Sequence, residues 1–205
     1  MPIWDWNLSF GNANGKQGWL PEHWLWPQLD NKECTWYRRL FDDPDFGQRY
    51  VDRWAALRTN AFATARLLAR IDTFAASLDE AQKRNFEKWP ILGRPVNPNY
   101  FVGSSYQEEI DWMKKFLLTR LDWIDQQFPP LPRLKVPPAG PTELLADNGL
   151  IYFTLDGTDP RAAGGEAAPA ARRYSTSIDL RKGAQLFARV RQENRWSAPL
   201  VFTVQ

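Results

Sequence analysis

The sequence has little cysteine and little histidine, and neither sign of charge dominates. Its 205 residues include one cysteine, Cys34, and one histidine, His23. A single cysteine excludes an internal disulfide and a cysteine-rich zinc site, and a single histidine leaves Ser-His-Asp catalysis only one base. The 26 basic and 24 acidic residues give a net charge of +2. The chain therefore lacks the concentrated basic excess that a nucleic-acid surface needs, and we expect no nucleic-acid partner.

Long apolar runs are also missing. No stretch approaches the roughly 18 apolar residues of a membrane span. The residues after Met1, Pro-Ile-Trp-Asp-Trp, show neither the basic and apolar regions nor the small-residue cleavage site of a secretory signal. We expect neither a membrane span nor a signal peptide in this chain.

Tryptophan, in contrast, is abundant, especially near the start. Six of the 11 tryptophans lie within the first 36 residues, namely Trp4, Trp6, Trp19, Trp24, Trp26 and Trp36. Aromatic residues make up 14% of the chain, and such large apolar side chains argue against intrinsic disorder. We expect a short strand near Ile3–Trp6, a long ordered loop through Gly11–Gly15, and mostly buried tryptophans.

From Thr35 onward the apolar residues recur at helical spacing. Asp43-Pro44 predicts the start of a helix over 44–58, and Asn60 predicts the cap of the next, which continues until Pro90 ends it. Residues 91–103 form a connector. Ser105 to Glu108 reads as a capping box at the start of an amphipathic helix over 105–127.

Proline-rich segments at 129–132 and 137–141 then separate two compositions. After them the apolar residues alternate, which predicts strands at 150–155, 177–180, 186–191 and 200–204. We predict an α+β fold with two domains: a mainly helical one over 1–130 and a small all-β, immunoglobulin-like sandwich over 131–205.

The first candidate site is an acidic and amide pair near the start. Asp5 and Asn7 are two positions apart, so on a strand they share one face, where both can reach one hard cation such as Mg²⁺. The alternative is structural: Asp5 caps a turn, and Asn7 satisfies loop backbone.

A resemblance favours the metal site. Residues 4–12, WDWNLSFGN, resemble the metal-binding motif of the spore-coat CotH kinase family, whose members are atypical protein kinases. Further segments similar to this family follow in the same order, at residues 36–46, 50–58, 81–93, 98–99 and 106–111. The resemblance implies the C-terminal, mainly helical part of a kinase-like fold over the first 130 residues.

By this resemblance Asp5 holds Mg²⁺ on the phosphates of ATP, and Asn7 stands where many relatives have a second aspartate. The family's catalytic aspartate, its second metal ligand and its phosphate-gripping basic residue lie before the motif, so we assign no catalytic residue here. Phosphoryl transfer needs the metal, the phosphates and the acceptor together. The first hypothesis is therefore a fragment of a CotH-type kinase, with Mg²⁺ and ATP as cofactors, inactive alone. The resemblance implies protein substrates of the spore coat or cell envelope, and an extracytoplasmic or envelope location.

The second resemblance concerns residues 131–205. The run at 151–161, IYFTLDGTDPR, with Tyr174, Ile178, Leu180, 188–189 and 196–197, looks like the chitobiase/β-hexosaminidase C-terminal type of domain. Such domains are non-catalytic modules of extracytoplasmic enzymes. The second hypothesis is accordingly a binding protein whose β module and Trp-rich surface dock on a glycan or a protein partner. Asp156-Gly157 and Asp159-Pro160 predict turns, and the alternative is a calcium or sugar site at these residues.

Overall fold

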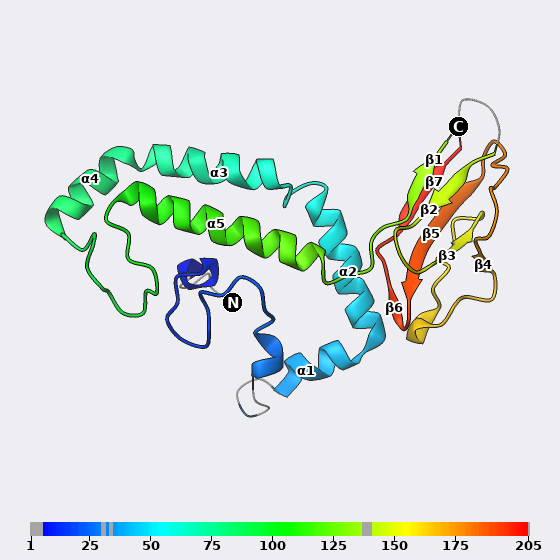
Figure 1. The fold of residues 1–205 in the computed structure, drawn as a ribbon, viewed down its shortest axis with the longest axis horizontal. Coiled ribbons are helices and arrows are strands. Elements are labelled where there is room, and N and C mark those ends of the chain that lie inside the picture. Colours follow the sequence, from blue (N-terminus) through cyan, green and yellow to red (C-terminus); the bar gives the residue numbers. More distant parts are fainter. Residues whose placement is uncertain (1–5, 30–31, 33–34, 137–140, 205) are drawn as a thin grey trace. The chain divides into compact units, whose positions relative to one another are not determined.

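A computed structural model describes residues 6–29, 32, 35–136 and 141–204. Within them the chain has five α-helices and seven β-strands, which confirms the α+β class (Figure 1). The helices are α1 (Thr35–Asp42), α2 (Pro44–Arg58), α3 (Thr64–Ser77), α4 (Asp79–Lys88) and α5 (Tyr106–Asp125). The strands are β1 (Arg133–Lys135), β2 (Glu143–Leu145), β3 (Leu150–Thr154), β4 (Arg172–Arg173), β5 (Gln185–Gln192), β6 (Arg195–Trp196) and β7 (Leu200–Thr203).

The chain divides into two compact units, each of which contains two segments. The helical unit consists of Met1–Asp30 and Leu57–Asp125, and the β unit consists of Asn31–Ala56 and Gln126–Gln205. Helix α1 and most of α2 therefore belong to the same unit as the strands. The division into sequence domains at residue 130 stays a prediction, and the compact units are divided at other positions.

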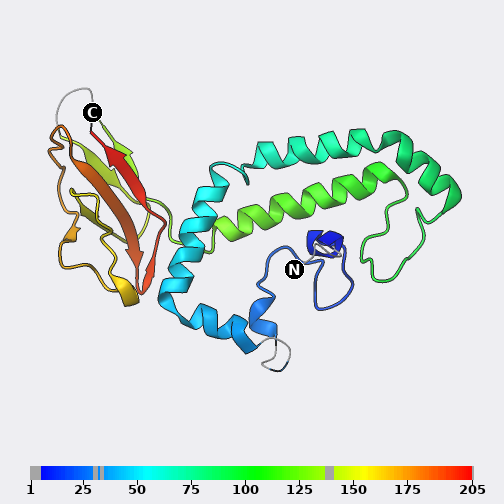
Figure 2. The same cartoon turned by 180° about the vertical axis from the view of Figure 1, so that it is seen from behind.

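In the helical unit, α3 and α5 lie side by side, and α4 continues from α3 (Figures 1 and 2). Phe116, Leu121 and Ile124 of α5 are buried, in keeping with the predicted apolar stripe. The capping box at the start of α5 is half confirmed. The Glu108 amide donates to Ser105 Oγ at 3.2 Å, but the Glu108 carboxylate accepts from Ser104 instead of returning to Ser105.

Of the two predicted helix caps, Asp43 is confirmed and Asn60 is wrong. The Asp45 amide donates to Asp43 Oδ1 at 2.8 Å, which confirms Asp43 as the cap of α2. Asn60 does not cap the next helix: α3 begins at Thr64, and Asn60 Oδ1 instead accepts from Arg66 at 2.6 Å. The predicted long helix is broken at Leu78 and ends at Lys88, before Pro90.

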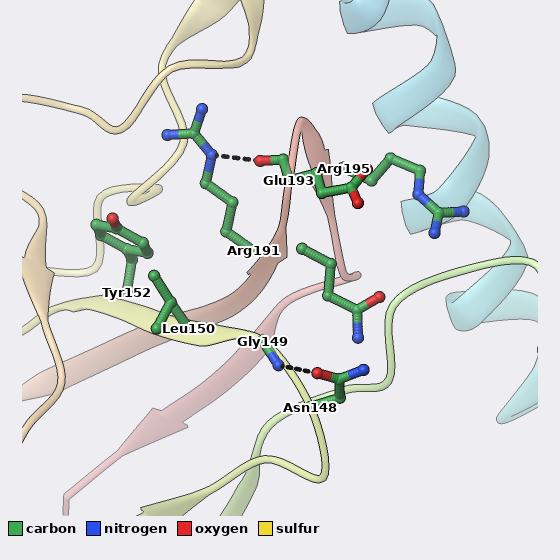
Figure 3. A pocket seen from close by; sticks show the side chains of 8 residues that line it. Asn148, Gly149, Leu150, Tyr152, Arg191, Glu193 and Arg195 are labelled. Atoms are coloured by element: carbon green, nitrogen blue, oxygen red, sulfur yellow. Dashed lines mark hydrogen bonds between the residues drawn. The ribbon is translucent and has the colours of Figure 1, made fainter.

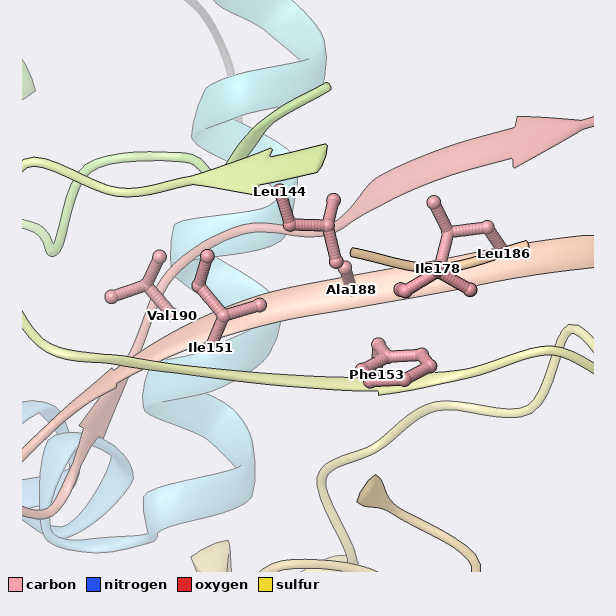
Figure 4. Packing of buried hydrophobic residues seen from close by; sticks show 7 residues of the cluster. All are labelled: Leu144, Ile151, Phe153, Ile178, Leu186, Ala188 and Val190. Carbon is pink, nitrogen blue, oxygen red and sulfur yellow. The ribbon is translucent and has the colours of Figure 1, made fainter. Parts of the chain in front are cut away.

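The β unit has a two-stranded sheet, β1-β2, and a five-stranded antiparallel sheet in which β5 pairs with β3, β6 and β7, and β3 pairs with β4. Side chains from both sheets form the core (Figure 4), made of Leu144, Ile151, Phe153, Ile178, Leu186, Ala188 and Val190. The strands predicted at 150–155, 186–191 and 200–204 are confirmed within a residue or two. The strand predicted at 177–180 is wrong, because Ile178 forms only an isolated bridge with Thr142.

The expectation of mostly buried early tryptophans is wrong for those whose side chains the structure describes. Trp19, Trp24 and Trp26 are half-buried, and Trp36 is 56% exposed. They lie in a loop and in short helices: Trp19, for example, stacks on Tyr100 at 4.6 Å between ring centroids.

The helical unit has an apolar groove. It lies between α3 and α5, has a volume of about 310 Å³, and is lined by residues that include Phe10, Ile71, Phe74, Leu78 and Met113. Among the described residues, no helix is both long enough and apolar enough to cross a membrane.

Candidate functional site

The predicted metal motif lies at the edge of what the structure describes. Asp5 is outside the described residues, as are Ile3 and Trp4 of the predicted strand. Asn7 lies in a short 3-10 helix, η1 (Trp6–Phe10), so the backbone there is not a strand. On a strand, alternation would place Asp5 and Asn7 on one face, but Asn7 lies in a 3-10 helix and this alternation does not apply to it. Their role as metal ligands stays a prediction.

The motif is fixed to α5 through Gly11, which follows η1 directly. Gly11 is buried and has a φ of +81°, a backbone conformation that favours glycine. A Cβ at this position would lie 2.2 Å from Cδ2 of Phe116. The Trp112 indole also donates to the Gly11 carbonyl at 3.3 Å. Because glycine has no side chain, the backbone at Gly11 can approach the buried face of α5.

The loop after the motif is ordered, as predicted, and is held by the connector before α5. Asn12 Oδ1 accepts from the amides of Tyr100 and Phe101 at 3.0 and 2.9 Å. The Asn14 amide donates to the Pro98 carbonyl at 2.8 Å. Because Phe101 stacks on Trp112 at 4.6 Å, this connector is itself attached to α5.

Arg120 attaches the end of the loop to α5. Its Nη1 donates to the carbonyls of Pro21, at 2.7 Å, and His23. Its guanidinium also lies about 5 Å from the ring centroids of Trp24 and Trp123. His23 contacts the Leu20 carbonyl through Nδ1 at 3.0 Å and thus forms a hydrogen bond within the loop.

Within the described ranges there is no group of three or more histidine, cysteine or acidic residues that could hold a metal ion. Asp5 lies outside the described residues, and of Asn7 only the backbone is described. Oxygen ligands such as a carboxylate and an amide suit Mg²⁺, which keeps several waters and takes only one or two protein ligands.

The turns predicted at Asp156-Gly157 and Asp159-Pro160 lie in the β unit and are confirmed. The Thr158 amide donates to Asp156 Oδ1 at 3.0 Å, and the Arg161 amide to Asp159 Oδ1 at 2.9 Å. Hydrogen bonds from the hydroxyl and amide of Thr158 hold the pKa of Asp156 below its ordinary value. Turn formation accounts fully for Asp156.

Asp159 has a further partner that the sequence did not reveal. It accepts from Nε and Nη2 of Arg189, which is 2% exposed on β5. Arg189 also binds Asp52 of α2, from the other segment of the β unit. One signal was present in the sequence: an arginine between the apolar residues Ala188 and Val190 of a buried strand needs a charged partner.

An open groove of about 570 Å³ lies at the end of the β unit where β3, β5 and β6 meet (Figure 3). Its lining is mixed polar and apolar, and the polar part includes Asn148, Tyr152, Arg191, Glu193 and Arg195. The arginines have partners in the chain: Arg191 binds the Glu193 carbonyl and Glu166, and Arg195 binds the Gln127 carbonyl. A glycan or protein partner for this region stays a prediction.

Acidification is expected to weaken the β unit through Asp45. Hydrogen bonds from Arg161 and from the Gly164 amide hold the pKa of Asp45 below its ordinary value of 3.8. Such a carboxylate stabilises the fold above its unfolded-state pKa, and this contribution is lost as the pH falls through the lower folded-state pKa. The unfolding free energies of wild type and Asp45→Asn should therefore converge as the pH is lowered from about 6 to about 2.

The measurement is urea unfolding at a series of pH values, with Asp122→Asn on the exposed face of α5 as the control. A wild-type advantage over Asp45→Asn that persists unchanged at the lowest pH would contradict the ion-pair explanation.

A protein-family model described as CotH kinase protein matches residues 1–124. No curated protein and no solved structure gives a significant match. The matched range covers more than half of the chain and contains the motif at 4–12, the loop, α1 to α4 and nearly all of α5.

Proposed function

Because the chain belongs to the CotH kinase family, we propose that it serves Mg²⁺- and ATP-dependent phosphoryl transfer to hydroxyl groups of proteins. The observation that carries this proposal is the family match over residues 1–124, which contains the motif around Asp5. The protein substrates would belong to the spore coat or the cell envelope, and the protein would act at that extracytoplasmic location.

In this proposal Asp5 is the Mg²⁺ ligand, and the attachment of Gly11 to α5 supports the position of the motif. When bound, the metal neutralises charge on the transferred phosphate. Asn7 would be the second residue to hold the metal, through its side-chain oxygen. The family's catalytic aspartate and phosphate-gripping basic residue are not recognisable in these 205 residues. We therefore propose that the chain acts together with nucleotide-binding residues outside it, and does not turn over ATP alone.

The experiment uses the protein purified from its native cells. It compares wild type with Asp5→Asn for transfer of the ATP γ-phosphate to a protein acceptor. The expected result is loss of transfer in Asp5→Asn and partial retention in Asn7→Ala, because only Asp5 supplies a charged ligand. Asp122→Asn, on the exposed face of α5, is the matched control and should retain transfer.

Two results would contradict parts of this proposal. Full transfer by Asp5→Asn would remove the metal-ligand role. Turnover of ATP by the isolated 205-residue chain, abolished by Asp5→Ala, would show that the chain needs no nucleotide-binding residues from elsewhere.

A further inference from the structure

The central strand of the β unit is covered on both faces. Leu186, Ala188 and Val190 of β5 point into the apolar core, and each has no exposed area. Because side chains alternate along a strand, Arg189 points to the opposite face, yet it is only 2% exposed. Asp159 and Ser197 enclose Arg189 on this face, and helix α2 contributes Asp52 to the same enclosure.

The guanidinium of Arg189 uses all five of its N–H donors. Nε and Nη2 donate to the two oxygens of Asp159 at 2.8 and 2.6 Å, while Nη1 and Nη2 donate to those of Asp52 at 2.7 and 2.9 Å. The fifth bond runs from Nη1 to the Ser197 carbonyl at 2.8 Å. Two bidentate carboxylates around one arginine fix both distance and orientation. One carboxylate comes from the β region and the other from the helix.

The same face of α2 makes two more polar contacts, one and two helical turns earlier. Gln48 is buried and donates from Nε2 to the Ser197 carbonyl at 3.2 Å and to Asp52 at 2.9 Å. Asp45 accepts from Arg161 at 2.7 Å and from the Gly164 amide at 3.1 Å. Asp45, Gln48 and Asp52 have the spacing i, i+3 and i+7, so they form one stripe along the helix.

The one buried side chain of α2 is polar. Gln48 is buried, whereas Asp45, Asp52 and most apolar residues of the helix are half-buried. A helix of 15 residues is marginal in water without tertiary contacts. The contacts with Arg161, Arg189 and Ser197 are tertiary contacts of this kind and contribute to holding α2 folded.

We propose that residues 126–205 form a helix-binding module whose ligand is α2 of the same chain, recognised by two carboxylates seven residues apart with an amide between them. This role goes beyond phosphoryl transfer. Helix α2 lies inside the range that matches the kinase family, yet it clusters with residues 126–205. The module would therefore stabilise a helix of the kinase-family region.

The test is amide hydrogen exchange of the full chain, comparing wild type with Asp52→Asn. Removing one charged partner of Arg189 should lower the protection of amides 48–56 by about 10- to 100-fold. Amides of β3 and β5 should keep their protection within about threefold, because Asp159 still neutralises Arg189 and the apolar core is unchanged.

Asp147→Asn is the matched control. Its carboxylate binds the exposed Arg133 in the same unit, so its loss should leave α2 protection unchanged. Two results would overturn the proposal. Unchanged protection of amides 48–56 in Asp52→Asn would show that the carboxylate does not hold the helix. An equal loss in α2, β3 and β5, including general unfolding of the variant, would show that α2 is not a separable ligand.

A second variant tests the recognised stripe independently. Gln48→Ala removes the buried amide and leaves both carboxylates around Arg189. The module should lose α2 protection selectively here as well, by about 5- to 10-fold. Unchanged α2 protection in this variant would remove the amide from the recognition pattern and overturn the proposal in its stated form.

Discussion

Replacement of Arg189 by glutamine is expected to lower the free energy of unfolding of the β unit by about 3 kcal/mol. The change removes a 2% exposed cation and leaves the carboxylates of Asp52 and Asp159 facing each other. Both carboxylates are about one-third exposed, so water can partly rehydrate them. The expected loss is therefore at the lower end of the range for breaking a buried ion pair.

The charge of Arg189 is secure over the whole practical pH range. Burial lowers its pKa, but the hydrogen bonds that it donates to Asp52 and Asp159 outweigh burial, so the pKa is raised overall. Glutamine retains polarity and some hydrogen bonding, so the effect of Arg189→Gln reports the loss of charge and of the bidentate geometry. Arg189→Lys keeps the charge but not the geometry, and should cost about half as much.

The measurement is thermal unfolding followed by the NMR signal of the Trp196 indole N–H, because this residue is buried in the β unit. Arg189→Gln should lower the midpoint by roughly 10 °C. Arg133→Gln, which removes an exposed ion pair with Asp147, is the matched control and should change it by no more than about 3 °C. Equal shifts in the two variants would refute the view that Arg189 anchors the unit.

Elements with strong local signals could be predicted from the sequence. The bounds of α2 follow from Asp43-Pro44 and the apolar periodicity, and those of α5 follow from Ser105 and a long amphipathic pattern. The longer strands β3, β5 and β7 follow from alternation. In each case the signal lies within the element itself, where propensity and periodicity act.

Elements that depend on distant partners could not be predicted. β1, β2, β4 and β6 have only two or three residues each, too few to show alternation, and they exist because neighbouring strands pair with them. Asn60 is a good helix cap by type, but Arg66 binds its side chain.

The compact units likewise depend on tertiary contacts. The proline-rich segments near residue 130 mark a change of composition, yet Asn31–Ala56 clusters with the strands. The reason is the stripe of Asp45, Gln48 and Asp52, whose partners are more than 100 positions away. A polar stripe on a helix ordinarily indicates a solvated face, and only the structure shows that this one is covered.

For the candidate metal site, the sequence supplied the identity of the motif and the structure supplied its attachment. Gly11 belongs to the run at 4–12 that resembles the family motif. Its contact with Phe116 of α5 joins positions that no local pattern connects. The site therefore has a structural requirement that can be tested separately from any metal.

Substitution of Gly11 by alanine is expected to destabilise the helical unit by about 3 kcal/mol. Two causes add. A φ of +81° is costly for any residue with a Cβ, by roughly 1–2 kcal/mol. The new Cβ would also lie 2.2 Å from the Phe116 ring, which must move or force the loop away from α5, at a cost of about 1–3 kcal/mol.

A double variant separates the two causes. Urea unfolding would be measured for Gly11→Ala, Phe116→Leu and both together, with Gly15→Ala as the control, since a Cβ at Gly15 meets nothing within 4 Å. If the ring contact matters, the double variant should be more stable than the sum of the single effects predicts, by about 1–2 kcal/mol. The backbone cost should remain in the double variant, because leucine at 116 does not change φ at residue 11. Strict additivity would show that the backbone conformation alone makes glycine necessary, and would remove close packing on α5 as the reason the motif is held there.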